Sequence, residues 1–192
     1  MEGLYLALSA LGCLVIFRHY QGRPQLEQDQ LVCLAFSLVC WLLSVLLGSW
    51  DEQPSTLGLL FANLVHYVAM PFSAIALAVL VLAWPLSRPH WGKLLLGAMA
   101  GFELGRRLDW GYAYRELLWS LAALCLLWAS VQLWRRRQAV AAASYAGAAL
   151  SLVLSLPVRQ WLPHLGNPDY WLAAYLLLLS LSLLLLSKRA AH

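Results

Sequence analysis

Long apolar runs separated by short polar segments dominate the chain. Apolar runs of helix-spanning length fall at about residues 3–17, 31–50, 57–84, 91–108, 114–134, 139–158 and 170–187. The segments between them contain Pro, Gly, Asn and Asp, which end helices. The pattern predicts an all-α, polytopic transmembrane helical bundle of about seven spans. With no repeat and no linker, we expect one integral membrane domain over residues 1–192.

Composition excludes a soluble fold. Of the 192 residues, 62% are apolar and 11% charged, against about 45–50% and about 25% in soluble domains. Ten Trp and eight Tyr, many near the ends of the runs, suit the aromatic belts of a membrane protein. The cysteines (Cys13, Cys33, Cys40, Cys125) lie inside apolar runs without CxxC spacing, so we expect core packing, no metal and no cofactor.

Basic residues alternate between the two sides of the predicted bundle. One set of loops collects nine of the thirteen Lys and Arg residues (Arg18, Arg23, Arg88, Lys93, Arg135, Arg136, Arg137, Lys188, Arg189) and the other collects four (Arg106, Arg107, Arg115, Arg159). The positive-inside rule therefore predicts that the N-terminus lies outside and the C-terminus in the cytoplasm. We expect a bacterial cytoplasmic (inner) membrane protein. The spread of these residues among loops argues against a nucleic-acid partner.

Ionisable residues inside the predicted spans are the main functional candidates, because they are costly in lipid and must face the bundle interior or water. Glu103 lies about 15 Å from Lys93 along the fourth span, near the expected midplane of the bilayer. Arg106 and Arg107 follow at i+3 and i+4 and share a face with Glu103. Asp109 comes directly after this span.

The third span carries a second polar stripe. Asn63, His66 and Tyr67 are spaced i, i+3 and i+4, and His66 lies about 14 Å from the span's start at residue 57. We expect this stripe to face Glu103 and the two arginines across a polar pocket that opens outward. Pro71 removes one backbone hydrogen bond and predicts a kink near Tyr67.

Two interpretations of these charges stay open. The Glu-Arg pair with its His and Asn neighbours can simply hold two helices in register, with the arginines reaching the headgroups. Alternatively, two Arg beside one Glu leave an excess positive charge, suited to a phosphate or carboxylate headgroup. His66 beside Glu103 is also a candidate proton carrier.

Small residues predict where helices pack closely. Gly97, Gly101 and Gly105 form a tandem GxxxG strip on the fourth span, away from Glu103. The sixth span repeats the spacing with Ala143, Gly147 and Ser151, and we expect the two strips to pack together. A dimerisation seam is the alternative.

The remaining motifs are weak. His164 and Asp169 have the HxxxxD spacing of some acyltransferases but lie in a predicted outer loop. The run at residues 135–137 is already explained by topology. Only His66 is deep, so paired haem ligands are not expected.

The sequence therefore favours a small, non-enzymatic membrane protein, either an accessory subunit or a binder of a lipid or small anionic ligand. Its expected partners are membrane lipids, with another membrane protein as a further candidate. A proton-coupled or anion/lipid transporter and a membrane-embedded lipid-modifying enzyme remain alternatives.

Overall fold

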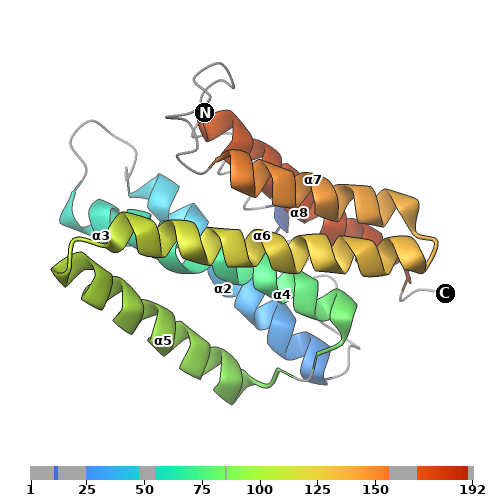
Figure 1. Ribbon diagram of the computed structural model, residues 1–192, viewed down its shortest axis with the longest axis horizontal. Helices are drawn as coiled ribbons and strands as arrows, with labels where there is room; N and C mark the ends of the chain where they lie inside the picture. The colour runs from blue at the N-terminus through green and yellow to red at the C-terminus, as the bar shows by residue number, and fades with distance from the viewer. Residues whose placement is uncertain (1–10, 13–24, 48–54, 85, 156–167, 190–192) are drawn as a thin grey trace.

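The computed structural model describes residues 11–12, 25–47, 55–84, 86–155 and 168–189 (Figure 1). The described regular structure is entirely helical. It comprises α2 (Gln25–Leu46), α3 (Thr56–Leu64), the π-helical turn η1 (Val65–Ala69), α4 (Met70–Leu82), α5 (Arg88–Arg107), α6 (Gly111–Arg135), α7 (Ala139–Leu154) and α8 (Pro168–Arg189). The predicted first helix at residues 3–17 lies outside the described residues, apart from positions 11 and 12.

Three described helical segments are long and apolar enough to cross a membrane: Gln28–Leu46, Thr56–Leu82 and Gly111–Arg135. This supports a helical membrane protein. Helix α5 is not among the three, because charged residues occupy both of its ends.

One boundary differs substantially from the sequence prediction. Residues 25–30, predicted as part of a turn, are the first residues of α2. Asp29 and Gln30 are buried there, and their side chains are satisfied by the segment that begins α5. These partners lie more than fifty residues away along the chain, so the polar residues extend the helix instead of ending it.

Helices α3, η1 and α4 form one continuous helical segment with an irregular middle. Pro71 has no backbone N–H, so it cannot complete the α-helical pattern with the carbonyl of Tyr67. The backbone accommodates this with a π-helical turn, in which the N–H of Met70 donates to the carbonyl of Val65. The irregularity falls where Pro71 predicts it.

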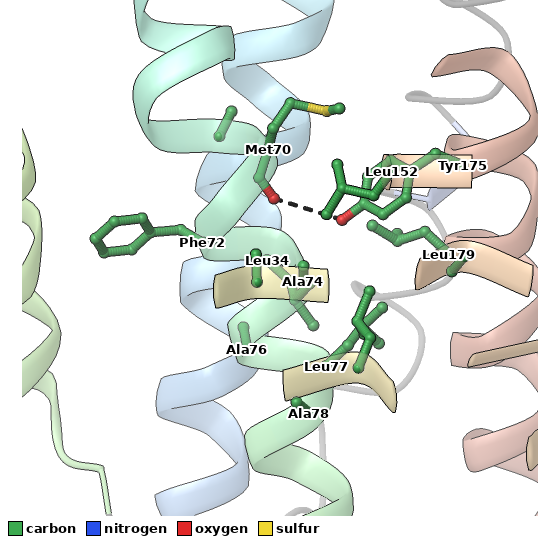
Figure 2. Packing of buried hydrophobic residues seen from close by; sticks show 14 of the residues in the cluster. Leu34, Met70, Phe72, Ala74, Ala76, Leu77, Ala78, Leu152, Tyr175 and Leu179 are labelled. Atoms are coloured by element: carbon green, nitrogen blue, oxygen red, sulfur yellow. Dashed lines mark hydrogen bonds between the residues drawn. The ribbon is translucent and has the colours of Figure 1, made fainter. Parts of the chain in front are cut away.

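Helix α4 lies at the centre of the core. It packs against α2 and α6, while α7 packs between α6 and α8. Figure 2 shows Met70, Ala74 and Leu77 of α4, with Leu152 of α7 and Tyr175 and Leu179 of α8 to one side of them. Small residues along α4 (Ala74, Ala76 and Ala78) are fully buried or nearly so and allow this close approach.

Buried hydroxyl groups join α4, α7 and α8. Ser73 and Tyr175 lie within hydrogen-bonding distance at 2.7 Å, and Tyr145 donates to the carbonyl of Leu77 at 3.1 Å. Ser182 on α8 donates to Ser144 on α7 at 3.1 Å. Interhelical hydrogen bonds of this kind contribute to helix association in a membrane, where apolar contacts between helices bring little gain over contacts with lipid.

Candidate functional site

The cluster of Glu103, Arg106 and Arg107 forms on one face of α5, as the i+3 and i+4 spacing predicts. Arg106 donates to both carboxylate oxygens of Glu103, from Nε at 2.9 Å and from a terminal nitrogen at 2.8 Å. Arg107 donates from Nε to the same carboxylate at 2.9 Å. One carboxylate thus orients two guanidinium groups, and the cluster keeps one net positive charge.

This cluster lies on the exposed side of α5. The side chains of Glu103, Arg106 and Arg107 are 42%, 62% and 72% exposed. Apolar and aromatic side chains around the end of the helix are exposed as well: Leu104, Leu108, Trp110 and Tyr112. The guanidinium groups are therefore accessible to a ligand approaching the outside of the bundle.

Asp109 shapes the turn between α5 and α6. Its φ of 57° places it in the left-handed region, which Asp tolerates better than most residues. The N–H of Trp110 then donates to the carbonyl of Gly105 at 2.7 Å, which closes the end of α5. Asp109 is exposed beside the cluster.

Tyr67 connects the π-helical turn η1 to the end of α5 and the start of α6, beside the Glu103 cluster. Its ring lies 4.1 Å from the ring of Phe102, the residue before Glu103. Its hydroxyl donates to the carbonyl of Gly111 at 3.3 Å, at the start of α6. Of the predicted polar stripe on the third span, Tyr67 is the residue that these contacts bring against α5.

His66 lies against α6. Its ring stacks on Trp119 at 5.8 Å, and its carbonyl accepts a hydrogen bond of 2.6 Å from the Trp119 indole. The guanidinium of Arg115 lies over two aromatic rings, 5.7 Å from the centre of the Trp119 ring and 5.3 Å from that of the Tyr112 ring. Asn63 is exposed on α3.

Arg115 is predicted from the sequence only as a loop residue, and Trp119 is not among the predicted site residues. The signal was present in the sequence, since Tyr112, Arg115 and Trp119 follow the i, i+3, i+7 spacing of one helix face. Their contact with His66 depends on how α6 is positioned against η1, which no local spacing specifies.

Two of the three strip glycines of α5, Gly101 and Gly105, pack on α6. A Cβ at Gly101 would lie 2.5 Å from the hydroxyl oxygen of Tyr114, and one at Gly105 would lie 3.5 Å from the Tyr114 Cβ. Gly97 faces open space. The sequence predicts that this strip packs against Ala143, Gly147 and Ser151. That prediction is wrong for Gly101 and Gly105, because the turn after α5 is short and places Tyr114 of α6 against them.

The sixth predicted span packs on another neighbour. A Cβ at Gly147 of α7 would lie 3.1 Å from a methyl carbon of Leu178 on α8. Ser151 is buried, and Ala143 is exposed.

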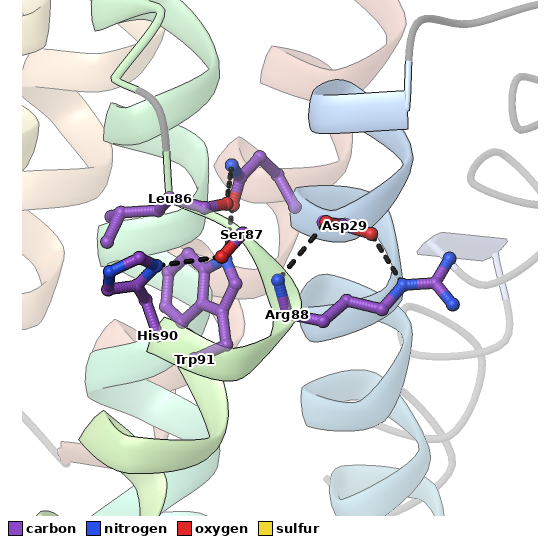
Figure 3. A network of polar contacts seen from close by, with 7 residues as sticks. Asp29, Leu86, Ser87, Arg88, His90 and Trp91 are labelled. Carbon is purple, nitrogen blue, oxygen red and sulfur yellow. Dashed lines mark hydrogen bonds and ion pairs between the residues drawn. The ribbon is translucent and has the colours of Figure 1, made fainter.

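A second polar cluster, missed by sequence reasoning, joins the starts of α2 and α5 (Figure 3). Asp29 accepts from the backbone N–H of Arg88 at 3.1 Å and from its Nε at 2.5 Å. Gln30 donates to the carbonyl of Leu86 at 2.9 Å and accepts from the indole of Trp91. Asp29 thus caps the N-terminus of α5 from a different helix, where a carboxylate is favoured by the helix dipole.

Within the described ranges, no group of three or more His, Cys, Asp or Glu side chains is placed to hold a metal ion. His164 of the HxxxxD motif lies outside those ranges, and of Asp169 only the backbone is described.

Comparison with known protein families, with curated proteins and with solved structures finds no match to this chain.

Proposed function

We propose that this chain is an integral membrane protein of about seven spans, located in a bacterial cytoplasmic membrane, which binds an anionic lipid headgroup or a similar small anion without catalysing a reaction. The proposed binding site comprises Glu103, Arg106 and Arg107. The surrounding residues are Asn63, His66, Tyr67 and Asp109.

The arrangement of helix ends supports the proposed orientation. The start of α2 contacts the start of α5 through Asp29 and Arg88, and Arg136 at the end of α6 donates to the carbonyl of Val81 near the end of α4. Exposed basic residues gather at this end: Arg88, Lys93 and residues 135–137. By the positive-inside rule this end is cytoplasmic, and the Glu103 cluster belongs to the outer half.

In the proposed arrangement Glu103 lies near the outer surface of the membrane, whereas its distance from Lys93 alone predicts a position near the midplane. Helix α5 ends at Arg107, so Glu103 lies about 6 Å from the helix end at 1.5 Å per residue. Exposed Trp110 and Tyr112 follow directly. Such aromatic residues favour the headgroup level of a bilayer, which is where a phosphate is available.

The observation that carries the proposal is the sharing of one carboxylate by two exposed guanidinium groups. Glu103 uses both oxygens to hold Arg106 and Arg107, so their orientation is set before a ligand arrives. Each guanidinium has five N–H donors, more than Glu103 engages. A phosphate placed beside them gains charge-assisted hydrogen bonds and neutralises the remaining positive charge.

The same geometry disfavours the two alternative activities at Glu103. Both oxygens of the Glu103 carboxylate already accept hydrogen bonds from arginines, so the group is poorly placed to act as a catalytic base or to carry protons. An accessory subunit remains compatible with this cluster, because an acidic residue of a partner protein can take the place of the headgroup.

Titration with a soluble lipid tests the proposal. We expect short-chain phosphatidylglycerol, added to the protein in a neutral detergent, to bind about tenfold more weakly after the double substitution Arg106→Gln and Arg107→Gln. The matched control is Arg135→Gln with Arg137→Gln, which removes the same charge from exposed positions at the end of α6 and should leave binding unchanged. Equal affinity in all three proteins would overturn the proposal.

A further inference from the structure

A cavity lies beside α5, at the end that carries the Asp29 cluster. The cavity has a volume of about 260 Å³ and lies between α2, α4 and α5. Its lining residues are Asp29, Val32, Cys33, Phe36, Phe72, Arg88, Trp91, Gly92 and Leu95. It lies near the opposite end of α5 from Glu103, so it is a separate site from the one proposed above.

Helix α5 packs mainly on α6 and η1, and in Figure 1 most of its ribbon runs apart from that of α2. Near its start, the Asp29 and Gln30 contacts hold α5 to α2. The ring of Trp91 reaches Phe72 of α4 at 5.9 Å. Gly92 adds no side chain to this wall, and a Cβ there would meet nothing within 4 Å.

The lining selects an alkyl chain. Apart from Asp29 and Arg88, the lining residues are apolar or glycine, and Val32 and Phe36 are partly exposed. The volume is below the about 300–1,000 Å³ that is usual for drug-sized ligands. A segment of one acyl chain suits this size and chemistry better than a cofactor does.

The rim supplies a positive charge. The Asp29 side chain is 8% exposed, and it is engaged by Arg88, whose side chain is 57% exposed. The charge accessible from outside at this end is therefore basic, which is complementary to a phosphate at the membrane surface.

We propose that the cavity between α2, α4 and α5 binds one acyl chain of an anionic phospholipid from the cytoplasmic leaflet, with the lipid phosphate at Arg88. The lipid fills the space that α5 leaves beside α2. Its phosphate becomes a second anionic partner of the exposed Arg88 guanidinium, beside Asp29.

Photocrosslinking from inside the cavity tests this proposal. A photoreactive phenylalanine analogue replaces Phe36, and the full chain is placed in nanodiscs of phosphatidylglycerol or of phosphatidylcholine. Mass spectrometry then identifies what is captured. We expect a phospholipid adduct, about fivefold more abundant with phosphatidylglycerol, a ratio that corresponds to the about 1 kcal/mol per basic residue seen at anionic membranes.

Two glycines of the same helix provide the matched variants. Gly92→Leu places a side chain in the cavity and should lower the adduct about tenfold. Gly97→Leu adds the same side chain where α5 also faces open space, but outside the cavity lining, and should leave the adduct unchanged.

Three results would overturn the proposal. They are equal adduct in the Gly92→Leu and Gly97→Leu proteins, equal capture of the two lipids, and capture of a polypeptide, which would identify a protein occupant. The double variant with Arg106→Gln and Arg107→Gln should give as much adduct as the parent protein. Failure of this proposal is therefore distinguishable from failure of the proposed headgroup site.

Discussion

Replacing Gly101 by alanine tests how α5 is held against α6. The Tyr114 ring lies across Gly101, with its hydroxyl donating to the carbonyl of Ala98 at 3.1 Å. A Cβ at position 101 would lie 2.5, 2.6 and 2.9 Å from three atoms at the far end of this ring. These distances are too short for real contacts, so the ring must turn away and its hydrogen bond must break.

The expected loss follows from three contributions. Overpacking costs about 1–3 kcal/mol, and the lost hydrogen bond costs about 1 kcal/mol. The higher helix propensity of alanine returns about 1 kcal/mol. We therefore expect Gly101→Ala to lower the free energy of unfolding by about 1–3 kcal/mol.

Gly97→Ala is the matched control, one helical turn earlier on α5. A Cβ there meets nothing within 4 Å, so only the propensity gain of up to about 1 kcal/mol should appear. The assay is unfolding by sodium dodecyl sulfate from a mild detergent, followed by far-UV circular dichroism.

A double-mutant cycle identifies the cause. If the ring of Tyr114 is responsible, Gly101→Ala should cost nothing in a Tyr114→Ala background. Equal stability of the Gly101→Ala and Gly97→Ala proteins would refute the packing described here. The same cost with and without the ring would refute the explanation by Tyr114.

Two further predictions concern the Asp29 cluster and the topology. Asp29→Ala removes the acceptor of two Arg88 hydrogen bonds and should lower the free energy of unfolding by about 1.5–3 kcal/mol in the same assay, and a stability equal to that of the parent would mean that Asp29 does not anchor α5. A reporter that is active only in the cytoplasm should be active when fused after Arg137 and inactive when fused after Asp51, and the reverse result would invert the proposed orientation.

The sequence was most informative where the physical cause is local. Glu103 pairs with Arg106 and Arg107 because i+3 and i+4 neighbours share a helix face, and this holds whatever surrounds the helix. Pro71 disturbs the third span because its missing N–H is a property of that residue alone. Both features are found at the predicted positions.

Features that depend on tertiary contacts were missed or wrong. Residues 25–30 look like a turn because they are polar, yet Asp29 and Gln30 find partners beyond α4. Gly101 and Gly105 have the same spacing as the small residues on α7, but spacing alone does not determine which helix packs against them. His66 stacks on Trp119 because of the position of α6 against η1, which a single sequence does not reveal.

The charge distribution of α5 connects the two proposed sites. Between Lys93 and Glu103 lie nine uncharged residues, which span about 14 Å of helix, about half of a 30 Å bilayer core. In the proposed seven-span arrangement, the basic side chains beyond them must therefore extend toward the headgroups or meet anionic partners. Glu103 neutralises one of the two arginines at the C-terminal end of α5, and Asp29 engages Arg88 at the other end. The positive charges that remain uncompensated are Lys93 and one of Arg106 and Arg107. An anionic phospholipid at each end would compensate them, so α5 should be more stable in anionic than in zwitterionic bilayers.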